Sequence, residues 1–313
     1  MIIIQLAGGL GNQMFQYALY LQLKSLGRTV RMDDVSGFVQ DAQRKPALAP
    51  FGISYERASR QELEEMLDAS MLPWNRVRRK LCGRKKKAYF EADKRYKPEI
   101  MEWDDIYLEG YWQTEKYFQA VSEEVRQAYD VDRLLQHPDM TRMEPGDGIR
   151  PAEDWLADIT STRSVSVHIR RGDYLLPENE TLFGSICTEE YYRVAMKMMR
   201  QEHPDCRFYF FTNDKEWVRG WLDGIGEEGN IVETGETNDY IEFALMSKCR
   251  HHILANSSFS WWASYLNKDP AKTVLAPDRW LNGWDCEDFY RQDMRRVAAE
   301  PYRTDKHDMQ REV

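Results

Sequence analysis

Cysteine is scarce in this chain of 313 residues, and its placement excludes two common uses. The five cysteines are scattered and include no C-x-x-C pair, so the sequence signals neither a zinc ribbon nor a redox dithiol. Scattered cysteines of odd number favour reduced thiols in a cytosol. No run of 18 apolar residues is present, and the N-terminus lacks the basic segment of a signal peptide. These absences predict a cytoplasmic protein.

Positive charge is also in deficit. The chain has 43 Lys and Arg against 52 Asp and Glu, and the resulting net charge of −9 argues against general nucleic-acid binding. The length is sufficient for two domains. The polar stretch 136–151, which carries several prolines and glycines, is the predicted boundary between domains 1–150 and 151–313.

Strand-like and helix-like segments alternate along the sequence. A buried strand at 2–6 is followed by a glycine-rich turn, a helix that Asn12 would cap, and a strand at 28–32. Such alternation predicts an α/β fold with parallel sheets and helices on both faces. Further strands are predicted at 106–109, 164–170, 207–212, 230–233, 251–255 and 273–275, and further helices at 61–69, 115–129, 189–201, 215–222, 239–248 and 259–266.

The segment 167–174 (VHIRRGDY) carries the clearest chemical signal. Side chains alternate along a strand, so His168 and Arg170 would share one face while the apolar residues take the other. Arg171 falls where the strand ends, and Gly172 permits a sharp turn. Ligands of open α/β sheets bind at the carboxyl ends of strands, and arginine forks match phosphate oxygens. The pattern predicts an anion site for diphosphate, although two solvated arginines at a surface strand end would also produce it.

Two other predicted strands end in polar side chains. Asp214 follows the apolar strand at 207–212, where it would either cap the next helix or accept hydrogen bonds from a base or ribose. Ser257 and Ser258 stand where a helix begins, so they are local caps or part of a phosphate site built on free helix amides. The neighbouring His251-His252 pair lacks the spacing of a metal ligand set and is interpreted as a strand feature.

The turn at 8–13 (GGLGNQ) only partly matches a dinucleotide fingerprint. Met14 occupies the position of the third glycine in G-x-G-x-x-G, although an acidic residue follows at Asp33 or Asp34. The hypothesis that the protein is a nicotinamide-dependent oxidoreductase is therefore weakened, but it stays an alternative. The other interpretations are a tight strand-to-helix turn, or close approach of backbone amides and Asn12 to a ligand between domains.

Positive charge is concentrated in the segment 76–87 (RVRRKLCGRKKK), in which eight of twelve residues are basic. A solvated face or loop is one interpretation of the run from Arg76 to Lys87, and contact with nucleic acid is the least favoured of three. The remaining one is attraction to anionic lipid headgroups, worth about 1 kcal/mol per basic residue near the surface. Peripheral contact with the inner face of a bacterial plasma membrane would suit an enzyme that acts on membrane-linked glycans. A non-catalytic module that binds a membrane surface is a further alternative.

Four segments in this order resemble the motifs of the α-1,2-fucosyltransferases, glycosyltransferase family 11. The resemblance implies a GT-B fold, in which two Rossmann-like domains face each other across a cleft. It also implies inverting, metal-independent transfer from GDP-β-L-fucose to a terminal galactose, with a different donor or linkage as the nearest alternative. The segments are 8–18 (GGLGNQMFQYA), 168–174 (HIRRGDY), 211–214 (FTND) and 256–262 (NSSFSWW).

The same resemblance implies roles for the residues of the second domain. His168 would contact the nucleotide, Arg170 would bind the β-phosphate and Arg171 would help position the diphosphate. Asp214 would recognise guanine. This assignment agrees with the chemistry, since a metal-free transferase needs fixed cations and amides to stabilise the leaving diphosphate, and no Asp-x-Asp tripeptide stands at a strand end.

The remaining roles concern phosphate, acceptor and proton transfer. The resemblance implies that Ser257 and Ser258 hold phosphate and that Asn12 and Gln13 lie near the reacting centre from the acceptor domain. Inverting transfer usually needs a base for the acceptor hydroxyl. Asp173 is a candidate by position, unless it braces the loop of Arg171.

Overall fold

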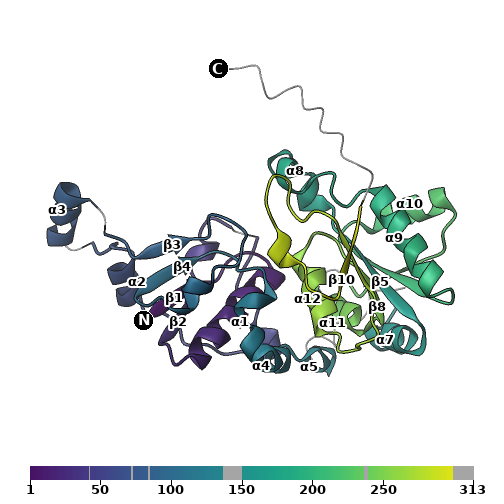
Figure 1. The fold of residues 1–313 in the computed structure, drawn as a ribbon, viewed down its shortest axis with the longest axis horizontal. Coiled ribbons are helices and arrows are strands. Elements are labelled where there is room, and N and C mark those ends of the chain that lie inside the picture. Colours follow the sequence, from purple (N-terminus) through teal and green to yellow (C-terminus); the bar gives the residue numbers. More distant parts are fainter. Residues whose placement is uncertain (42, 72, 84, 137–149, 236–238, 299–313) are drawn as a thin grey trace, which may run out of the picture.

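The computed structural model describes residues 1–41, 43–71, 73–83, 85–136, 150–235 and 239–298. Two sheets lie one beyond the other along the long axis of the molecule (Figure 1). Their strand orders are β2-β1-β4-β3 and β10-β9-β8-β5-β6-β7, and every pairing is parallel. The strands are β1 (Ile2–Gln5), β2 (Val30–Asp33), β3 (Ala88–Phe90), β4 (Ile106–Glu109), β5 (Ser164–Ile169), β6 (Arg207–Thr212), β7 (Asn230–Ile231), β8 (His251–Ile253), β9 (Val274–Pro277) and β10 (Met294–Val297).

Helices separate most consecutive strands, as right-handed crossovers between parallel strands require. None of the described helices is long and apolar enough to cross a membrane. They are α1 (Leu10–Ser25), α2 (Arg60–Met66), α3 (Pro73–Cys82), α4 (Ser122–Ala128), α5 (Val131–Gln136), α7 (Ala152–Ser161), α8 (Pro177–Phe183), α9 (Glu189–Glu202), α10 (Lys215–Ile225), α11 (Asp239–Lys248) and α12 (Ser258–Leu266).

The predicted α/β architecture with parallel sheets is confirmed. The alternation predicted along β5 is also confirmed, because Val165, Val167 and Ile169 all join the hydrophobic core beneath α9 and α10. Ser166, on the opposite face, bonds the ring of His252 at 2.8 Å. The period-two pattern of β5 therefore decides which side chains join the core beneath α9 and α10 and which leave the sheet on its other face.

Two local predictions are wrong, and two strands were not predicted. The first helix begins at Leu10 and its N-cap is Gly9, so Asn12 lies in the first turn and does not cap it. The helix predicted at 115–129 is broken into two 3-10 helices (Glu115–Tyr117 and Gln119–Val121) and α4, and the buried Phe118 between them has a non-helical backbone. The short strands β3 and β10 have no clear periodicity, and the sequence did not predict them.

The predicted domain boundary lies mostly outside the described residues, since 137–149 are not described. The two sheets use residues 2–109 and 164–297, but one hydrophobic core runs between them. Phe15 of α1 packs against Trp261 and Trp262 of α12 at ring distances of 4.6 and 4.8 Å. Phe118 stacks on Trp262 at 5.3 Å. An aromatic contact of this density holds the two halves in a fixed orientation.

Candidate active site

The second sheet has a topological switch point between β5 and β8. The chain adds β6 and β7 on one side of β5, then continues on the other side through β8, β9 and β10. Where the strand order reverses, the crossovers diverge and leave a crevice at the carboxyl ends of the strands. The segments that leave the two strands there are 170–172 and 254–258, which contain the predicted anion-site residues.

The first sheet has its own switch point between β1 and β4. The chain adds β2 on one side of β1, and β4 with β3 on the other. The segments that follow these two strands are 6–9 and 110–113. By the same rule, ligands of this half would bind where the glycine-rich turn meets the end of β4.

Asn12 joins the two switch points. Its side-chain oxygen accepts a hydrogen bond of 2.7 Å from the amide of Gln113 and one of 2.9 Å from the hydroxyl of Ser258. The indole of Trp262 donates to the carbonyl oxygen of Gly11 at 2.9 Å. A Cβ atom at Gly11 would lie only 2.6 Å from the backbone of Ser258. Gly11 thus permits the close approach of α1 to α12. The sequence had left open a tight turn or the close approach of a ligand at this position.

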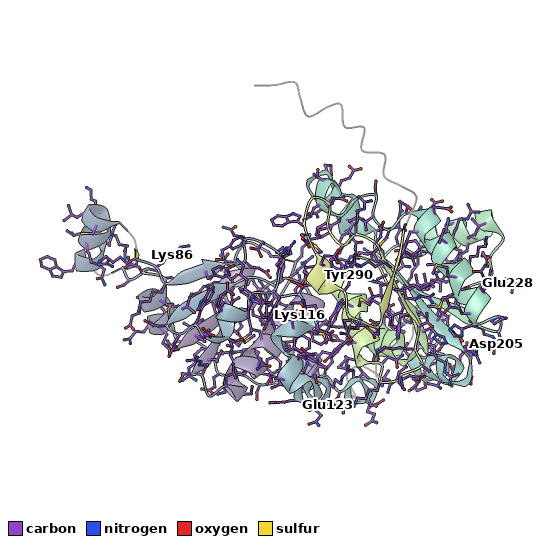
Figure 2. All side chains as sticks on the ribbon, in the orientation of Figure 1. Lys86, Lys116, Glu123, Asp205, Glu228 and Tyr290 are labelled. Carbon is purple, nitrogen blue, oxygen red and sulfur yellow. The ribbon has the colours of Figure 1, made fainter. Side chains whose placement is uncertain are left out.

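A second bridge between the halves lies near Lys116, which Figure 2 labels close to their junction. Its ammonium group contacts the carboxylate of Asp288 at 2.5 Å. The backbone N–H of Tyr96 donates to the same carboxylate at 2.7 Å, and Arg95 pairs with Asp285. Polar contacts therefore complement the aromatic core in setting the spacing of the two sheets.

Arg171 is held on three sides at the carboxyl end of β5. Its Nε atom bonds Asp214 at 3.0 Å, and its guanidinium carbon lies 3.8 Å from the ring centre of Trp217. Its backbone N–H donates to the side chain of Asn213 at 2.9 Å. Asp214 also caps α10, because it accepts from the N–H of Trp217 at 3.2 Å. The capping interpretation of Asp214 is confirmed, and the carboxylate fixes the cation next to the switch point as well.

His168 lies in β5 and Arg170 directly follows its last residue. The ring of His168 packs against that of Phe259 of α12, with 5.6 Å between the ring centres. His168 is buried, and its Nδ1 atom has no hydrogen-bond partner within the described chain. Burial, with a smaller contribution from the nearby charge of Arg170, lowers the pKa of His168 to about 3. The imidazole is therefore neutral at any ordinary pH and offers one unused ring nitrogen. Arg170 is partly exposed, with its guanidinium 5.8 Å from the ring centre of Tyr174.

Ser257 and Ser258 begin α12 on the other side of the switch point. The hydroxyl of Ser257 accepts from the N–H of Phe259 at 3.3 Å, so it is the local cap of the helix. The preceding Asn256 is anchored by its amide to the carbonyl oxygen of Trp280 at 3.2 Å. These contacts fix the start of α12, the positive end of its dipole, beside β8 and against Asn12 of α1.

Gln13 was predicted near the reacting centre, but its side chain is fully engaged and buried. Its amide donates to the carbonyl oxygens of Gly8 and Lys45 at 2.8 and 2.9 Å, and its oxygen accepts from the N–H of Ala47 at 2.8 Å. These three bonds hold the loop around 45–47 against the glycine turn. Asp173 lies in a 3-10 helix (Gly172–Leu175), and its side chain is outside the described part of the structure.

A buried carboxylate that was not predicted from the sequence lies at the end of β3. Glu91 accepts hydrogen bonds from the N–H groups of Tyr111 (2.9 Å) and Trp112 (3.2 Å), and Lys94 pairs with it at 3.3 Å. Burial raises the pKa of Glu91 while Lys94 opposes the rise. The ammonium group of Lys94 also lies 5.8 Å from the ring centre of Trp284 in the other half. The only sequence signal was an acidic residue after a three-residue strand, which is too short to recognise by periodicity.

Metal ligands do not gather anywhere in the described residues, where no group of three His, Cys, Asp or Glu side chains has the arrangement of a metal site. The adjacent histidines of β8 are engaged structurally. His252 bonds Ser166 and Asn267 at 2.8 and 3.0 Å, and His251 accepts from the N–H of Thr273 at 3.0 Å. These contacts confirm the interpretation of the pair as a strand feature.

Two Rossmann-like domains with facing switch points define the GT-B class of architecture. The chain belongs to glycosyltransferase family 11, whose model matches residues 1–293. Membership of this family excludes the alternative hypothesis of a nicotinamide-dependent oxidoreductase. The structure agrees, because the acidic side chain of Asp33 is occupied by the N–H groups of Val35 and Ser36 and by the hydroxyl of Tyr107.

Known proteins resemble this chain over most of its length. An α-1,2-colitosyltransferase from Escherichia coli is 27% identical, with 92% of this chain and 95% of the relative covered. A galactoside α-(1,2)-fucosyltransferase 1 from Ateles belzebuth is 29% identical, with 83% of this chain and 63% of the relative covered. The solved structure of POFUT1 in complex with GDP-fucose has a TM-score of 0.43 at 12% identity, with 89% and 98% of the two chains covered.

Proposed function

We propose that this glycosyltransferase moves L-fucose from GDP-β-L-fucose to O2 of a terminal galactose, with inversion and without a metal ion. The observation that carries the proposal is the meeting of the two switch points through Asn12 and Ser258 at 2.9 Å. In this proposal the cationic strand end of one domain would face the glycine turn of the other. A donor with two phosphates and an acceptor from the opposite side fit this arrangement. The similarity to a galactoside α-(1,2)-fucosyltransferase supports the acceptor and the linkage.

The donor diphosphate would bind between the end of β5 and the start of α12. Negative charge grows on the diphosphate as the sugar leaves, so groups already oriented toward it stabilise the transition state more than the ground state. Arg170 would bind the β-phosphate, and Arg171 would help position the diphosphate without needing to reorganise, because Asp214 and Trp217 already hold it. The amides at the N-terminus of α12, beside Ser257 and Ser258, would add donors.

Recognition of the nucleotide would use hydrogen bonds with His168 and Asp214. The unpartnered ring nitrogen of His168 is buried and uncharged, so a hydrogen bond to the nucleotide would satisfy a polar atom that otherwise has none. Asp214 would accept hydrogen bonds from guanine through lone pairs that Arg171 and the helix cap leave available. Removal of His168 Nδ1 would therefore weaken nucleotide binding without changing the chemical step.

The acceptor would enter from the first domain. Asn12 and Gln13 would lie near the reacting centre, Asn12 by its direct contact with α12 and Gln13 by shaping the loop around Lys45. Asp173 is proposed as the base that takes the proton of the attacking hydroxyl, since it follows the donor arginines by two residues. In the balanced step, the O2–C1 bond forms, the C1–phosphate bond breaks, the proton passes to the base and GDP leaves.

A second donor is favoured by one specific finding, the 27% identity to an α-1,2-colitosyltransferase over nearly the whole chain. The same anion site would accept any sugar carried by GDP, because its contacts are to phosphate and nucleotide. The sugar pocket would then decide between fucose and colitose. Competition between GDP-fucose and the corresponding activated colitose, measured as a ratio of kcat/KM values, would rank the two donors.

The test is a single reaction mixture of purified protein, GDP-fucose, lactose and EDTA. Released GDP and a trisaccharide with fucose on O2 of galactose would support donor, linkage and metal independence together. GDP release without trisaccharide would support the proposed donor site but not lactose as the acceptor, and other galactosides would then be tested. Absence of GDP release with every galactoside, together with no calorimetric binding of GDP, would refute the proposal.

A further inference from the structure

A protruding segment carries α3 away from the rest of the molecule. Residues 67–87 leave and rejoin the first domain at one point, where the N–H of Lys87 donates to the carbonyl oxygen of Met66 at 2.9 Å. Asp68 braces this base, because it accepts from the N–H of Lys85 at 2.9 Å and pairs with Arg78 and Arg79. Figure 1 shows α3 at the end of the long axis, on the side opposite the second domain.

The apolar side chains of α3 are not buried by the protein. Trp74 is 84% exposed, Leu81 is 78% exposed and Val77 is 50% exposed. Their spacing of three and four residues puts them on one face of the helix. In the described residues, none of the three belongs to a hydrophobic core cluster. A helix with a contiguous uncovered apolar face marks an interaction surface, because exposing it to water costs free energy without any compensating contact.

Basic side chains lie on the other sides of this helix and at its base. Arg76 and Lys80 lie outside the apolar face of α3, and Lys85 and Lys86 follow the helix. Figure 2 labels Lys86 beside the stalk of the protrusion. Across the described chain these four make no ion pair with an acidic group, and all are exposed. A cluster of unneutralised cations is notable on a chain whose net charge is −9. Arg84 lies outside the described residues.

We propose that α3, with Lys85 and Lys86, forms a docking surface for the anionic face of a lipid bilayer. The helix would lie in the interface with its apolar side among the acyl chains and its cations at the headgroups, as short amphipathic helices do. Trp74 has the rigid, partly polar ring that is favoured at that depth. The flanking lysines reach phosphate while their stems stay in apolar surroundings. Together they act as the two signals that stable peripheral binding requires.

The positive charge of α3 favours a lipid bilayer over a second copy of this chain as the partner of this surface. A symmetric dimer through α3 would bring the same cations of both copies together, and like charges at close range oppose association. An anionic surface neutralises these cations instead, and each basic residue contributes about 1 kcal/mol to the free energy of binding. The inference is independent of the proposed donor and acceptor, because it concerns a surface remote from the switch points.

The experiment is flotation of the full chain with vesicles of phosphatidylglycerol and phosphatidylcholine in equal parts, compared with vesicles of phosphatidylcholine alone. We expect binding to the anionic vesicles that weakens with added salt. Reversing three exposed cations (Lys80→Glu, Lys85→Glu and Lys86→Glu) should lower the partition coefficient about a hundredfold or more. The matched control makes the same charge change elsewhere, with Lys197→Glu, Arg219→Glu and Lys268→Glu, and should retain most of the binding.

A second variant tests the apolar face. Trp74→Ser with Leu81→Ser should reduce binding to anionic vesicles at least tenfold while leaving the thermal unfolding temperature unchanged, since neither side chain is packed. Two outcomes would overturn the inference. One is equal binding by the wild type and both α3 variants. The other is a concentration-dependent dimer in sedimentation that Trp74→Ser with Leu81→Ser dissolves, which would make the face a contact between copies.

Discussion

At the strand ends, single residues have structural roles that their residue types alone do not predict. Arg171 and Asp214 form one unit with Trp217, in which a carboxylate and an aromatic face hold a guanidinium in place. Such a cation is preorganised, because it loses little side-chain entropy when a phosphate binds. Arg170 carries the complementary role in the proposal, as the cation that meets the β-phosphate.

Arg170→Ala should reduce kcat/KM by roughly a hundredfold or more, which corresponds to at least about 2.7 kcal/mol of transition-state stabilisation. The physical reason is the lost charge at the leaving group. Steady-state kinetics with GDP-fucose would measure it. Arg219→Ala, on the exposed face of α10, is the control and should behave as wild type. A near-normal turnover number in Arg170→Ala would remove this residue from the mechanism.

Gly11→Ala should destabilise the fold by about 1–3 kcal/mol, because the added methyl group would lie 2.6 Å from the backbone of Ser258. Gly220→Ala is the matched control, since nothing lies within 4 Å of its Cβ position. It should be neutral or stabilising by up to about 1 kcal/mol, as expected for alanine inside a helix. Urea unfolding of both variants gives the comparison. Equal stabilities would mean that the close contact of α1 with α12 is not a tight constraint.

At the scale of elements, polar groups are buried at helix ends and on helix faces that pack inside the protein. The start of α12 contacts Asn12 of α1, and the rest of the helix is buried among aromatic rings. Helix α11 packs beside it and carries Glu242, a largely buried carboxylate 3.4 Å from Lys215. Burial raises the pKa of Glu242 to about 7, although Lys215 opposes the rise.

The raised pKa of Glu242 makes stability depend on pH in a defined direction. Between its ordinary value near 4.5 and about 7, the folded state holds a proton that the unfolded state releases. The contribution of this carboxyl to the free energy of unfolding is therefore fully present below pH 4.5 and is lost as the pH rises toward 7. Glu242→Gln removes the titration while keeping the shape.

The free energy of unfolding of the wild type, relative to Glu242→Gln, should thus fall by on the order of 1–3 kcal/mol between pH 4.5 and 7.5. Urea titrations at several pH values would measure the difference. The comparison isolates this group from His168, whose lowered pKa works in the opposite direction and is common to both proteins. A constant difference across this range would show that the carboxyl titrates normally.

At the scale of the whole molecule, the two sheets belong to one packed body. The aromatic contacts of α12 with α1 and the segment around Phe118 join both domains in a single core. The ion pair of Lys116 with Asp288 lies outside that core. We infer that the domains do not unfold independently, because neither can expose its half of the core without disrupting the other.

Trp262→Ala should lower the free energy of unfolding by about 3–5 kcal/mol, since the side chain is fully buried and bonded to Gly11. The loss should appear as one shifted transition in calorimetry, with no separate transition left in place. Trp284→Ala, at a half-exposed position, serves as the control for loss of an indole and should change stability much less. Two transitions, of which only one shifts, would contradict the shared core.

Much of this architecture followed from local patterns in the sequence. The alternation in β5, the apolar run of β6 and the order of strands and helices predicted parallel sheets and put Arg170, Asp214 and Ser257 at strand ends. Those patterns are readable because side-chain burial repeats every two residues in strands and every 3.6 in helices. Short strands such as β3 span too few residues to show a period, and Phe118 breaks a helix for reasons of packing.

The sequence by itself determined the fold class, the family motifs and the chemistry available at each strand end. Only the tertiary structure decided which strand ends meet, as when Asn12 contacts Ser258 across 246 positions of sequence. It also decided that Gln13 braces a loop, that Glu91 is buried, and that α3 stands apart with Trp74 exposed. The reason is that local periodicity encodes the face a side chain takes, whereas contacts between distant segments depend on how whole elements pack.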